Sequence, residues 1–451
     1  MKTKLLVGTV LCLAGTSVFA GGLFTNTNQN PVFFRQPAQN AVIGIQGTYY
    51  DPAGLALMEE GFHYGIGNQV AIQERRIQST YAPFAYNASR PGQTTVEFKG
   101  ETVSPFIPTL DFAYNQNNWA ASFHFGVLSG GGACKFDNGL GSFESQLSIP
   151  VLMNTPSMYK GYSADINFTG KQYGFAGQFN FSYKLIDNDA LKLAVAAGIR
   201  LNSLKNDYSG GIFNYNLITV AGAPVSATAA TAGLFNDNME VGCIQKGFAV
   251  NPILSSHLTF GNLDFAARYE FNTSVTLKNE TEINTAGLAQ FTDGDESRAD
   301  LPAILAVGLN YSILPTLRAS LGYNLFFDKD ADYNGREKLL GGNSHEELVG
   351  LEWDACEKFT VSTGAQFTHF DYGEGNQYLN DMSFSLGCWC LGLGGRYHIN
   401  DNMAIDLSCF KTFYDEFEKD YASYTGKVPA PGHDVFNRES LSFGLGLVYD
   451  F

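Results

Sequence analysis

The most informative absence in this sequence is a long apolar run in its interior. After residue 20, no stretch reaches the roughly 18 uninterrupted apolar residues that a membrane-spanning helix requires. Basic residues are also scarce, because 28 Lys and Arg stand against 44 Asp and Glu, for a net charge of −16. An acidic chain of this kind is poorly suited to nucleic acid or other polyanions. We therefore expect no helical membrane protein and no nucleic-acid partner.

Motifs for catalysis and metal binding are missing as well. The seven His are scattered, and no Gly-x-Ser-x-Gly, His-Glu-x-x-His or phosphate-binding loop occurs. The acidic run Asp293-Gly-Asp-Glu296 lacks the further ligand spacing of a Ca²⁺ loop, which favours a solvated loop tip. We predict a protein that is not an enzyme and that uses neither a cofactor nor a metal.

The first twenty residues have the pattern of an export signal. Lys2 and Lys4 precede an apolar stretch at residues 5–14, and Ser17-Val-Phe-Ala20 offers the small residues of a cleavage site. Removal of residues 1–20 leaves 26 basic and 44 acidic residues, a net charge of −18. Six cysteines remain, which permits disulfides, but Cys388 and Cys390 would share one strand face. Buried or lipid-facing free thiols are therefore the favoured interpretation.

Large apolar and small or polar residues alternate at the end of the chain. The large residues of this run are Leu441, Phe443, Leu445, Leu447, Tyr449 and the terminal Phe451. A period of two with one apolar face predicts a β-strand against apolar surroundings. A closing strand with a terminal aromatic is typical of bacterial outer-membrane barrels, so we expect Phe451 to engage the barrel assembly machinery.

Alternating segments recur from residue 62 onward, and their connections come in two lengths. Short turns are expected at residues 115–118, 187–190, 261–262, 314–316, 355–358 and 400–402. Long connections are expected at residues 78–94, 131–170, 205–244, 283–298, 329–345, 372–380 and 416–438. Six short and seven long connections predict an all-β, transmembrane, antiparallel 14-stranded barrel over residues 62–451. We expect a monomeric, multi-pass outer-membrane protein of a Gram-negative cell. The tight turns, the start of the first strand and the end of the last strand would all face the periplasm.

Residues 21–61 do not alternate. They carry turn and helix-start signals together with apolar residues such as Val32, Phe33 and Phe34. We predict that this segment folds inside the barrel lumen as an N-terminal hatch, or plug. A loose periplasmic tail is the alternative, and the apolar content disfavours it.

Four stretches of the chain resemble one known family. They are Asn26-Thr-Asn-Gln-Asn30, Arg35-Gln-Pro-Ala-Gln-Asn40, Asp51-Pro-Ala-Gly-Leu-Ala56 and Ser104-Pro-Phe-Ile-Pro108. The chain resembles the FadL/TodX/OmpP1 family over essentially its whole mature length. The resemblance implies an outer-membrane transporter of long-chain fatty acids and other hydrophobic compounds, with a hatch that includes Arg35. Asp51, Pro52 and Ala53 match the family's Asn-Pro-Ala hatch motif with Asp in place of Asn.

Two of the long connections are unexpectedly apolar. The residues that stand out are Phe143, Leu147, Ile149, Phe213, Leu217 and Phe235. Clustered apolar residues in loops mark binding surfaces, and the family resemblance favours an extracellular groove for a hydrophobic ligand. Mutual packing of the loops as a cap over the barrel is the alternative.

Three arginines at inward positions could receive an acidic head group. We predict this role for Arg200, Arg268 and Arg318, with Arg200 first because no acidic residue flanks it on its own inward face. The alternative is that luminal charges pair with one another and hold the hatch.

Glycines in the third strand offer a place for a kink. Gly126, Gly130 and Gly131 weaken strand pairing, and the family resemblance implies a sideways opening there; a plain strand-to-loop transition is the alternative. The sequence as a whole predicts passive uptake of hydrophobic molecules from the outer membrane and its lipid, with long-chain fatty acids as the leading cargo. A general diffusion porin and a structural or adhesive protein are the alternatives.

Overall fold

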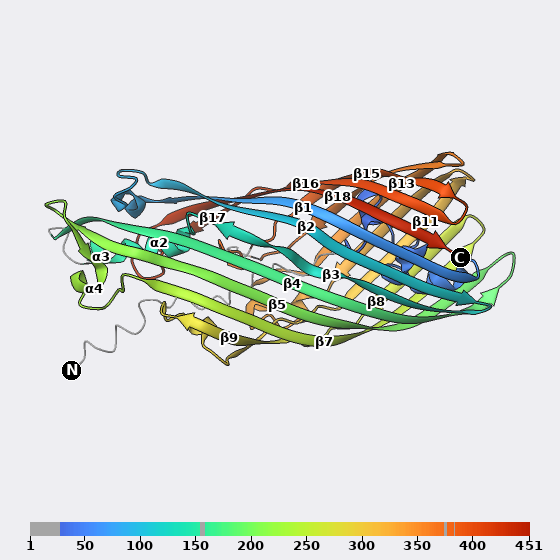
Figure 1. The fold of residues 1–451 in the computed structure, drawn as a ribbon, viewed down its shortest axis with the longest axis horizontal. Coiled ribbons are helices and arrows are strands. Elements are labelled where there is room, and N and C mark those ends of the chain that lie inside the picture. Colours follow the sequence, from blue (N-terminus) through green and yellow to red (C-terminus); the bar gives the residue numbers. More distant parts are fainter. Residues whose placement is uncertain (1–27, 154–157, 374–376, 383) are drawn as a thin grey trace.

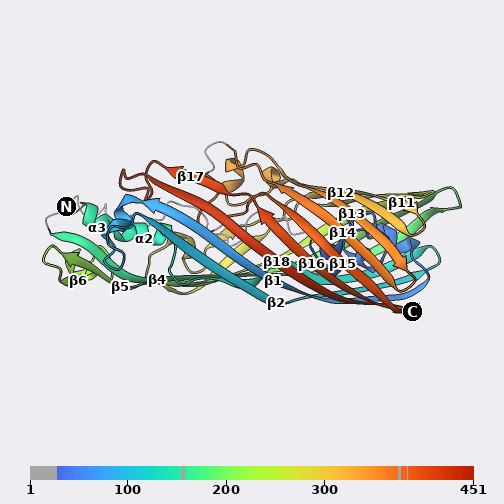
Figure 2. The same cartoon turned by 90° about the horizontal axis from the view of Figure 1, so that it is seen from above.

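The strands of the protein form one elongated antiparallel ring. The structure is a computed structural model that describes residues 28–153, 158–373, 377–382 and 384–451. Two side views, related by a turn of 90° about the long axis, show the arrangement of the strands (Figures 1 and 2). The predicted signal peptide at residues 1–20, and residues 21–27 of the predicted hatch, lie outside the described residues.

Eighteen strand segments and ten short helical segments make up the described chain. The strands are β1 (Gly61–Tyr81), β2 (Thr95–Gln116), β3 (Trp119–Phe136), β4 (Tyr159–Asp187), β5 (Lys192–Thr219), β6 (Pro224–Ser226), β7 (Met239–Phe260), β8 (Leu263–Glu270), β9 (Thr276–Asn284), β10 (Glu296–Arg298), β11 (Ile304–Leu314), β12 (Leu317–Phe326), β13 (Ser344–Cys356), β14 (Phe359–His369), β15 (Cys388–Asn400), β16 (Met403–Tyr414), β17 (Phe417–Tyr421) and β18 (Gly432–Asp450). The helices are α1 (Pro31–Arg35), η1 (Ile45–Thr48), η2 (Ala53–Leu57), η3 (Ala82–Tyr86), α2 (Gly141–Leu147), α3 (Ile149–Met153), α4 (Ala227–Ala230), η4 (Ala289–Phe291), η5 (Asp328–Asp330) and η6 (Arg336–Leu339).

These segments occupy fourteen positions around a closed ring, as the alternation predicts. β1 pairs with β2 on one side and with β18 on the other, which closes the ring. Three of these positions are each occupied by two consecutive segments. β8 and β9 both pair with β7, and β11 and β10 pair with β8 and β9 at the next position. β16 and β17 both pair with β18. The short β6 pairs only with the end of β5 among the described strands.

The six tight turns lie where the sequence predicts them, and they share one end of the ring with the C-terminus (Figure 1). The predicted limits of the long connections, however, are wrong. β3 and β4 extend into predicted loop 131–170, and β5 and β7 extend into predicted loop 205–244, leaving connections of only 137–158 and 220–238.

The reason for this error is a change in the outer face of the strands. On β1 the outward residues are apolar up to Ile72, except for Asn68, and polar from Glu74 onward. Ile72 pairs with Val103 of β2, and Glu74 pairs with Glu101, so β2 changes at the same level, as does β18. The lower part of the ring therefore carries an apolar outer band, and the part near the long loops has a polar outside.

Above this level the inward residues become the apolar ones. On β5, Leu204, Tyr208 and Ile212 are buried, whereas Lys205 and Ser209 are exposed. The period of two continues, but the apolar and polar sides exchange, because the outside now faces water and the inside forms a packed core. Part of the apolar signal in predicted loop 205–244, such as Leu217, thus comes from inward residues of a strand.

A large apolar cluster fills the long-loop end. It joins inward residues of β1 to β5 with α2, α3 and the connection between β14 and β15. Among the described residues, no helix is both long and apolar enough to cross a lipid bilayer. Cys134, Cys243, Cys356, Cys388, Cys390 and Cys409 are all free thiols, as the sequence favours.

One buried carboxyl group makes this loop-end cluster sensitive to pH. Burial, with a contribution from the charge of Asp434, raises the pKa of Asp381 to about 6. Asp381 lies in the connection between β14 and β15, and its carboxylate accepts a hydrogen bond from the backbone N–H of Ser142 in α2 (2.8 Å). Because the folded loop binds the proton more tightly than the unfolded chain, its stability falls as the pH rises from about 4 through 6.

We expect Asp381→Asn to protect the loop end at neutral pH while changing little below pH 4. The amide avoids the buried charge and keeps an oxygen for the Ser142 N–H. Hydrogen exchange of the backbone amides in α2, followed between pH 4 and 8 and corrected for intrinsic rates, measures the effect. The exposed Glu418→Gln in β17 is the matched control. An unchanged pH profile in Asp381→Asn would contradict the assignment.

Candidate functional site

The interior of the ring at its tight-turn end is occupied by residues 28–60 (Figure 1). All five residues of α1 are buried. Asp111 of β2 is one wall residue that holds this interior segment: it accepts hydrogen bonds from Asn30 Nδ2 and Thr48 Oγ1, each at 2.6 Å. His124 Nδ1 lies 2.7 Å from the same carboxylate. The interior segment is therefore fixed to the wall by buried polar contacts.

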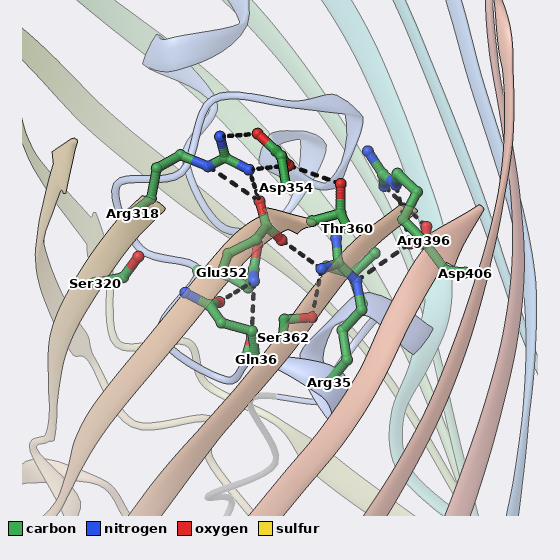
Figure 3. A network of polar contacts seen from close by, with 12 residues as sticks. Arg35, Gln36, Arg318, Ser320, Glu352, Asp354, Thr360, Ser362, Arg396 and Asp406 are labelled. Atoms are coloured by element: carbon green, nitrogen blue, oxygen red, sulfur yellow. Dashed lines mark hydrogen bonds and ion pairs between the residues drawn. The ribbon is translucent and has the colours of Figure 1, made fainter. Parts of the chain in front are cut away.

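Arg35 makes the most extensive charged contact between the interior segment and the wall (Figure 3). Its Nη1 pairs with Glu352 of β13 and donates to Ser362 Oγ of β14 at 2.6 Å, while its Nε lies 3.1 Å from Asp406 of β16. One side chain thus joins three wall strands.

The carboxylates around Arg35 are also paired within the wall. Arg318 binds Glu352 at 2.9 Å and Asp354 at 2.7 Å, and Arg396 binds Asp406 at 2.8 Å. With Arg35, the cluster (hereafter the Arg35 network) holds three guanidinium groups and three carboxylates. Its charges balance only when the interior segment is in place.

The predicted hatch residues Asp51, Pro52 and Ala53 contact the opposite wall. The carboxylate of Asp51 lies 2.5 Å from His257 Nδ1 of β7. The Pro52 carbonyl accepts a hydrogen bond from Ser182 of β4 (2.6 Å), and the Ala53 N–H donates to Ser255 of β7 (3.2 Å). The side chain of Asp51 thus reaches the wall through a charged group.

The three arginines predicted to receive a head group are all ion-paired. Arg200 binds Glu270 of β8 through two contacts of 2.5 and 2.9 Å, and Arg268 lies 3.2 Å from the same carboxylate. Both guanidinium groups also stack on the ring of Tyr49, at 4.6 and 4.7 Å. Arg318 belongs to the Arg35 network. These arginines hold the wall and the interior segment together.

The six residues predicted to form a ligand groove lie at the long-loop end. Phe143 is in α2 and Ile149 in α3, and both are buried in the loop-end cluster, as are Leu147, Leu217 and Phe235. Phe213 is half-buried on β5. The structure brings five of the six together in one packed cluster, and it places Leu217 and Phe213 on a strand instead of a loop.

The wall between β2 and β3 is interrupted. From the tight turn, β2 and β3 are paired as far as Leu110 opposite Phe125. Toward the long loops, their pairing resumes only at Glu101 opposite Lys135. In this fully described part of the chain, residues 102–109 and 126–134 are thus not paired with each other. Pro105 and Pro108 contribute to the interruption, because proline has no N–H to donate to a strand ladder. We call this interruption the wall gap.

Side chains satisfy backbone groups beside the wall gap. The Val127 carbonyl of β3 accepts a hydrogen bond from Gln29 Nε2 of the interior segment (3.1 Å). On β2, Asn68 of β1 accepts from the Ile107 N–H (3.0 Å) and donates to the Pro105 carbonyl (3.2 Å). These contacts give partners to three backbone groups at the gap, which reduces the cost of the interruption, and the interior segment touches the edge of the gap.

The glycines predicted to kink β3 lie along the gap. Gly130 and Gly131 have φ of +74° and +110°, values that favour glycine, and β3 changes register against β4 between Val127 and Ser129 and again at Gly131. Gly126 lies lower and pairs regularly with Ala176 of β4. A Cβ at Gly130 would lie 1.9 Å from the Gln172 carbonyl oxygen, so this position admits only glycine in the observed backbone.

A cavity of about 330 Å³ lies beside the gap. Its lining includes Phe33 and Phe34 from the interior segment, Phe136 and Phe168 from the loop-end cluster, and Ile107 from the gap edge. Such a volume is at the lower end for small-molecule pockets, which span about 300–1,000 Å³. The cavity is a partly apolar chamber above the interior segment.

Two arginines of this cavity, Arg75 and Arg438, were missed from the sequence. Inward residues have even numbers on this part of β18 and odd numbers on β1, and Arg438 and Arg75 fit these two patterns. Ile72 and Leu441 are outward residues that pair with each other. Because each arginine lies three positions from one of them on the same strand, alternation would have placed both arginines inside. The charged run Glu-Arg-Arg at residues 74–76 obscured this signal, because it looks like a solvated end of a strand.

Potential metal ligands come together at one outward position. Side-chain atoms of His345, Glu347 and His369 lie within 4.8 Å of one another on β13 and β14. Glu347 already pairs with both histidines, at 3.4 and 3.0 Å. This group lies on the outer face, away from the cavity, and we assign it no part in the site.

Comparison with known proteins rests on the fold. No known protein family and no curated protein matches the sequence. A FadL homologue from Pseudomonas aeruginosa matches with a TM-score of 0.64 at 12% identity, over 95% of this chain and 100% of the other. The Pseudomonas putida toluene transporter TodX matches with a TM-score of 0.58 at 12% identity, over 97% and 100% of the two chains.

A third solved structure agrees with these two. The Ralstonia pickettii toluene transporter TbuX matches with a TM-score of 0.56 at 14% identity, over 95% of this chain and 100% of the other. The ring, its interior segment and these neighbours together confirm, at the level of fold, the resemblance to the FadL/TodX/OmpP1 family that the sequence indicates.

Proposed function

We propose that this protein is an outer-membrane channel for the passive uptake of hydrophobic molecules, with long-chain fatty acids as its cargo. In this proposal, residues 28–60 are the hatch that closes the tight-turn end. The fold of a FadL homologue and of toluene transporters supports this class of cargo. The observation that carries the proposal is the cavity above the hatch, which residues from both edges of the wall gap line.

The outer surface supports a membrane location. The apolar band ends at one level on β1, β2 and β18, where Ile72 and Val103 give way to Glu74 and Glu101. A barrel in the outer membrane carries such a band toward lipid and its longer loops toward the outside. The long-loop end would then be extracellular.

The arrangement suggests a route for cargo. A hydrophobic molecule would first bind among the apolar residues of the loop-end cluster, including Phe143, Leu147 and Phe235, as α2 and α3 move apart. It would then occupy the cavity, with about 0.8 kcal/mol gained per buried methylene. The hatch fills the lumen below, so the wall gap beside Gly130 and Gly131 provides a sideways exit into the bilayer.

Cell uptake tests the proposal directly. In cells that lack a fatty-acid transporter of their own, we expect the protein to restore uptake of radiolabelled palmitate, compared with an empty vector. In planar bilayers the purified protein should show no steady porin-sized ion conductance, because the hatch closes the lumen. A correctly folded barrel at the cell surface that gives no uptake, or a stable large conductance, would overturn the proposal in favour of a structural protein or a porin.

A further inference from the structure

Arg75 of β1 and Arg438 of β18 face each other on the inner wall. They are direct partners in the pairing of the two strands, and both line the cavity. The two residues that flank Arg75, Glu74 and Arg76, pair with each other on the other side of the wall. The cavity therefore receives two positive charges from adjacent positions of neighbouring strands.

These two arginines differ from the other charged arginines of the lumen. Arg35, Arg200, Arg268, Arg318 and Arg396 each pair with a carboxylate. Within the described chain, neither Arg75 nor Arg438 has a carboxylate partner, and the described lining of the cavity contains no Asp or Glu. Like charges directly opposite each other across two strands are unfavourable. A bound anion would relieve the repulsion between the two guanidinium groups.

The groups around the pair leave donors available. Arg438 Nη2 donates to Gln73 Oε1 at 2.7 Å, and its buried Nε has no hydrogen-bond partner. The Arg75 guanidinium stacks on the ring of Phe384 at 5.5 Å, and that of Arg438 on Tyr414 at 4.9 Å. Aromatic stacking orients a guanidinium while leaving its edge free to bind a carboxylate through two parallel hydrogen bonds.

The same cavity also has apolar side chains among its Ser, Thr and Gln residues, and these can contact an apolar chain. Phe33, Phe34, Val127 and Phe410 lie in the same lining as the arginine pair. A cavity that combines two cationic groups with apolar side chains fits an amphiphile with one anionic head. A neutral hydrocarbon would leave both charges without a partner, which is costly in a desolvated site.

We propose that Arg75 and Arg438 form a head-group site that selects amphiphiles with an anionic head, specifically long-chain carboxylates, over neutral hydrophobic molecules. This inference rests on the proposed function, because it assigns the cargo class of the same cavity. The site lies just above the level where the outer band ends. The carboxylate would remain in the cavity while the tail extends along the apolar wall toward the gap.

Binding to protein in lipid nanodiscs tests the site. The probes are palmitate, hexadecanol and hexadecyl phosphate, each radiolabelled, and the variants are Arg75→Gln, Arg438→Gln and the double variant. We expect each single variant to weaken palmitate binding by about tenfold, the typical effect of losing one charge-assisted hydrogen bond. Hexadecanol binding should stay at the wild-type level. Arg75→Lys should recover part of the palmitate affinity.

A matched control separates head-group recognition from stability. Arg76→Gln removes the neighbouring outward charge and leaves the cavity lining intact, so it should not change the ratio of palmitate to hexadecanol binding. Retention of this ratio in the folded double variant would overturn the head-group site, as would stronger binding of hexadecanol than palmitate by the wild type. Tighter binding of hexadecyl phosphate than palmitate would replace the carboxylate by a phosphate head. Failure of the wild type to bind any of the three probes would overturn the proposed function itself.

Discussion

Replacing Arg35 with methionine should turn the closed ring into an ion-conducting pore. The methionine keeps an apolar stem at the position but leaves Glu352 and Asp406 with one guanidinium fewer. Removal of one partner from a buried ion pair costs about 3–5 kcal/mol, whereas a neutral hydrogen bond contributes about 0.5–1.5 kcal/mol. The Arg35 network is therefore the contact whose loss weakens the seating of residues 28–60 most. Steady conductance in planar bilayers, absent from the wild type, is the measurement.

Arg396→Met is the matched control for this experiment. It removes a guanidinium from the same Asp406, at 2.8 Å, but both residues belong to the wall. Its conductance should stay close to that of the wild type, even if thermal stability falls. Equal conductance in the two variants would show that general loosening of the wall, and not release of the hatch, opens the pore. A closed Arg35→Met channel would remove the hatch role of Arg35.

A disulfide across the wall gap should stop uptake and restore it on reduction. A Cβ placed on Gly132 of β3 would lie 3.5 Å from the Cβ of Ser104 on β2, at the lower end of the range of about 3.5–4.5 Å found in disulfides. The double variant Ser104→Cys with Gly132→Cys would thus join the two strands at the point where their pairing is interrupted. Oxidised protein should give palmitate uptake close to that of cells without it, because the gap can no longer widen.

The reduced form of the same double variant is the control for this experiment. Reduction with a membrane-permeant thiol should return uptake to the level of each single-cysteine variant. A Cys134→Ser background is needed, because the free thiol of Cys134 lines the same cavity. Undiminished uptake in the fully oxidised variant would exclude the gap as the exit and point to a route past the hatch.

The ring was predictable because its signals are local. Each tight turn shows as a short polar break, and each lower strand shows apolar residues at alternate positions, such as Leu321 and Tyr323 on β12. Strand ends were not predictable in the same way. Residues such as Leu204 and Tyr208 of β5 keep the period of two of the lower strand, but here the apolar residues face inward. Only the position of the outer band decides on which face of a strand the apolar residues lie.

The polar site was beyond sequence reasoning for a different reason. The inward direction of Arg200 could be inferred, but its partner Glu270 lies 70 residues away on a strand that is not its immediate neighbour. The lack of an acidic residue on the same strand face suggested that Arg200 is a free cation. In the ring, however, the acidic partner comes from a strand two positions away. Similarly, the pairing of Arg75 with Arg438 joins the first and last strands, and it exists only once the ring closes.

The level at Ile72 and Glu74 has a consequence for mutational tolerance. Below it, a leucine on the outer face would be harmless and an aspartate damaging, since that face is apolar. A few residues higher on the same strand, the outer face accepts the aspartate and the inner face demands the leucine. The rule for acceptable substitutions thus reverses midway along single strands, and any comparison of related sequences must treat the two halves of one strand as different environments.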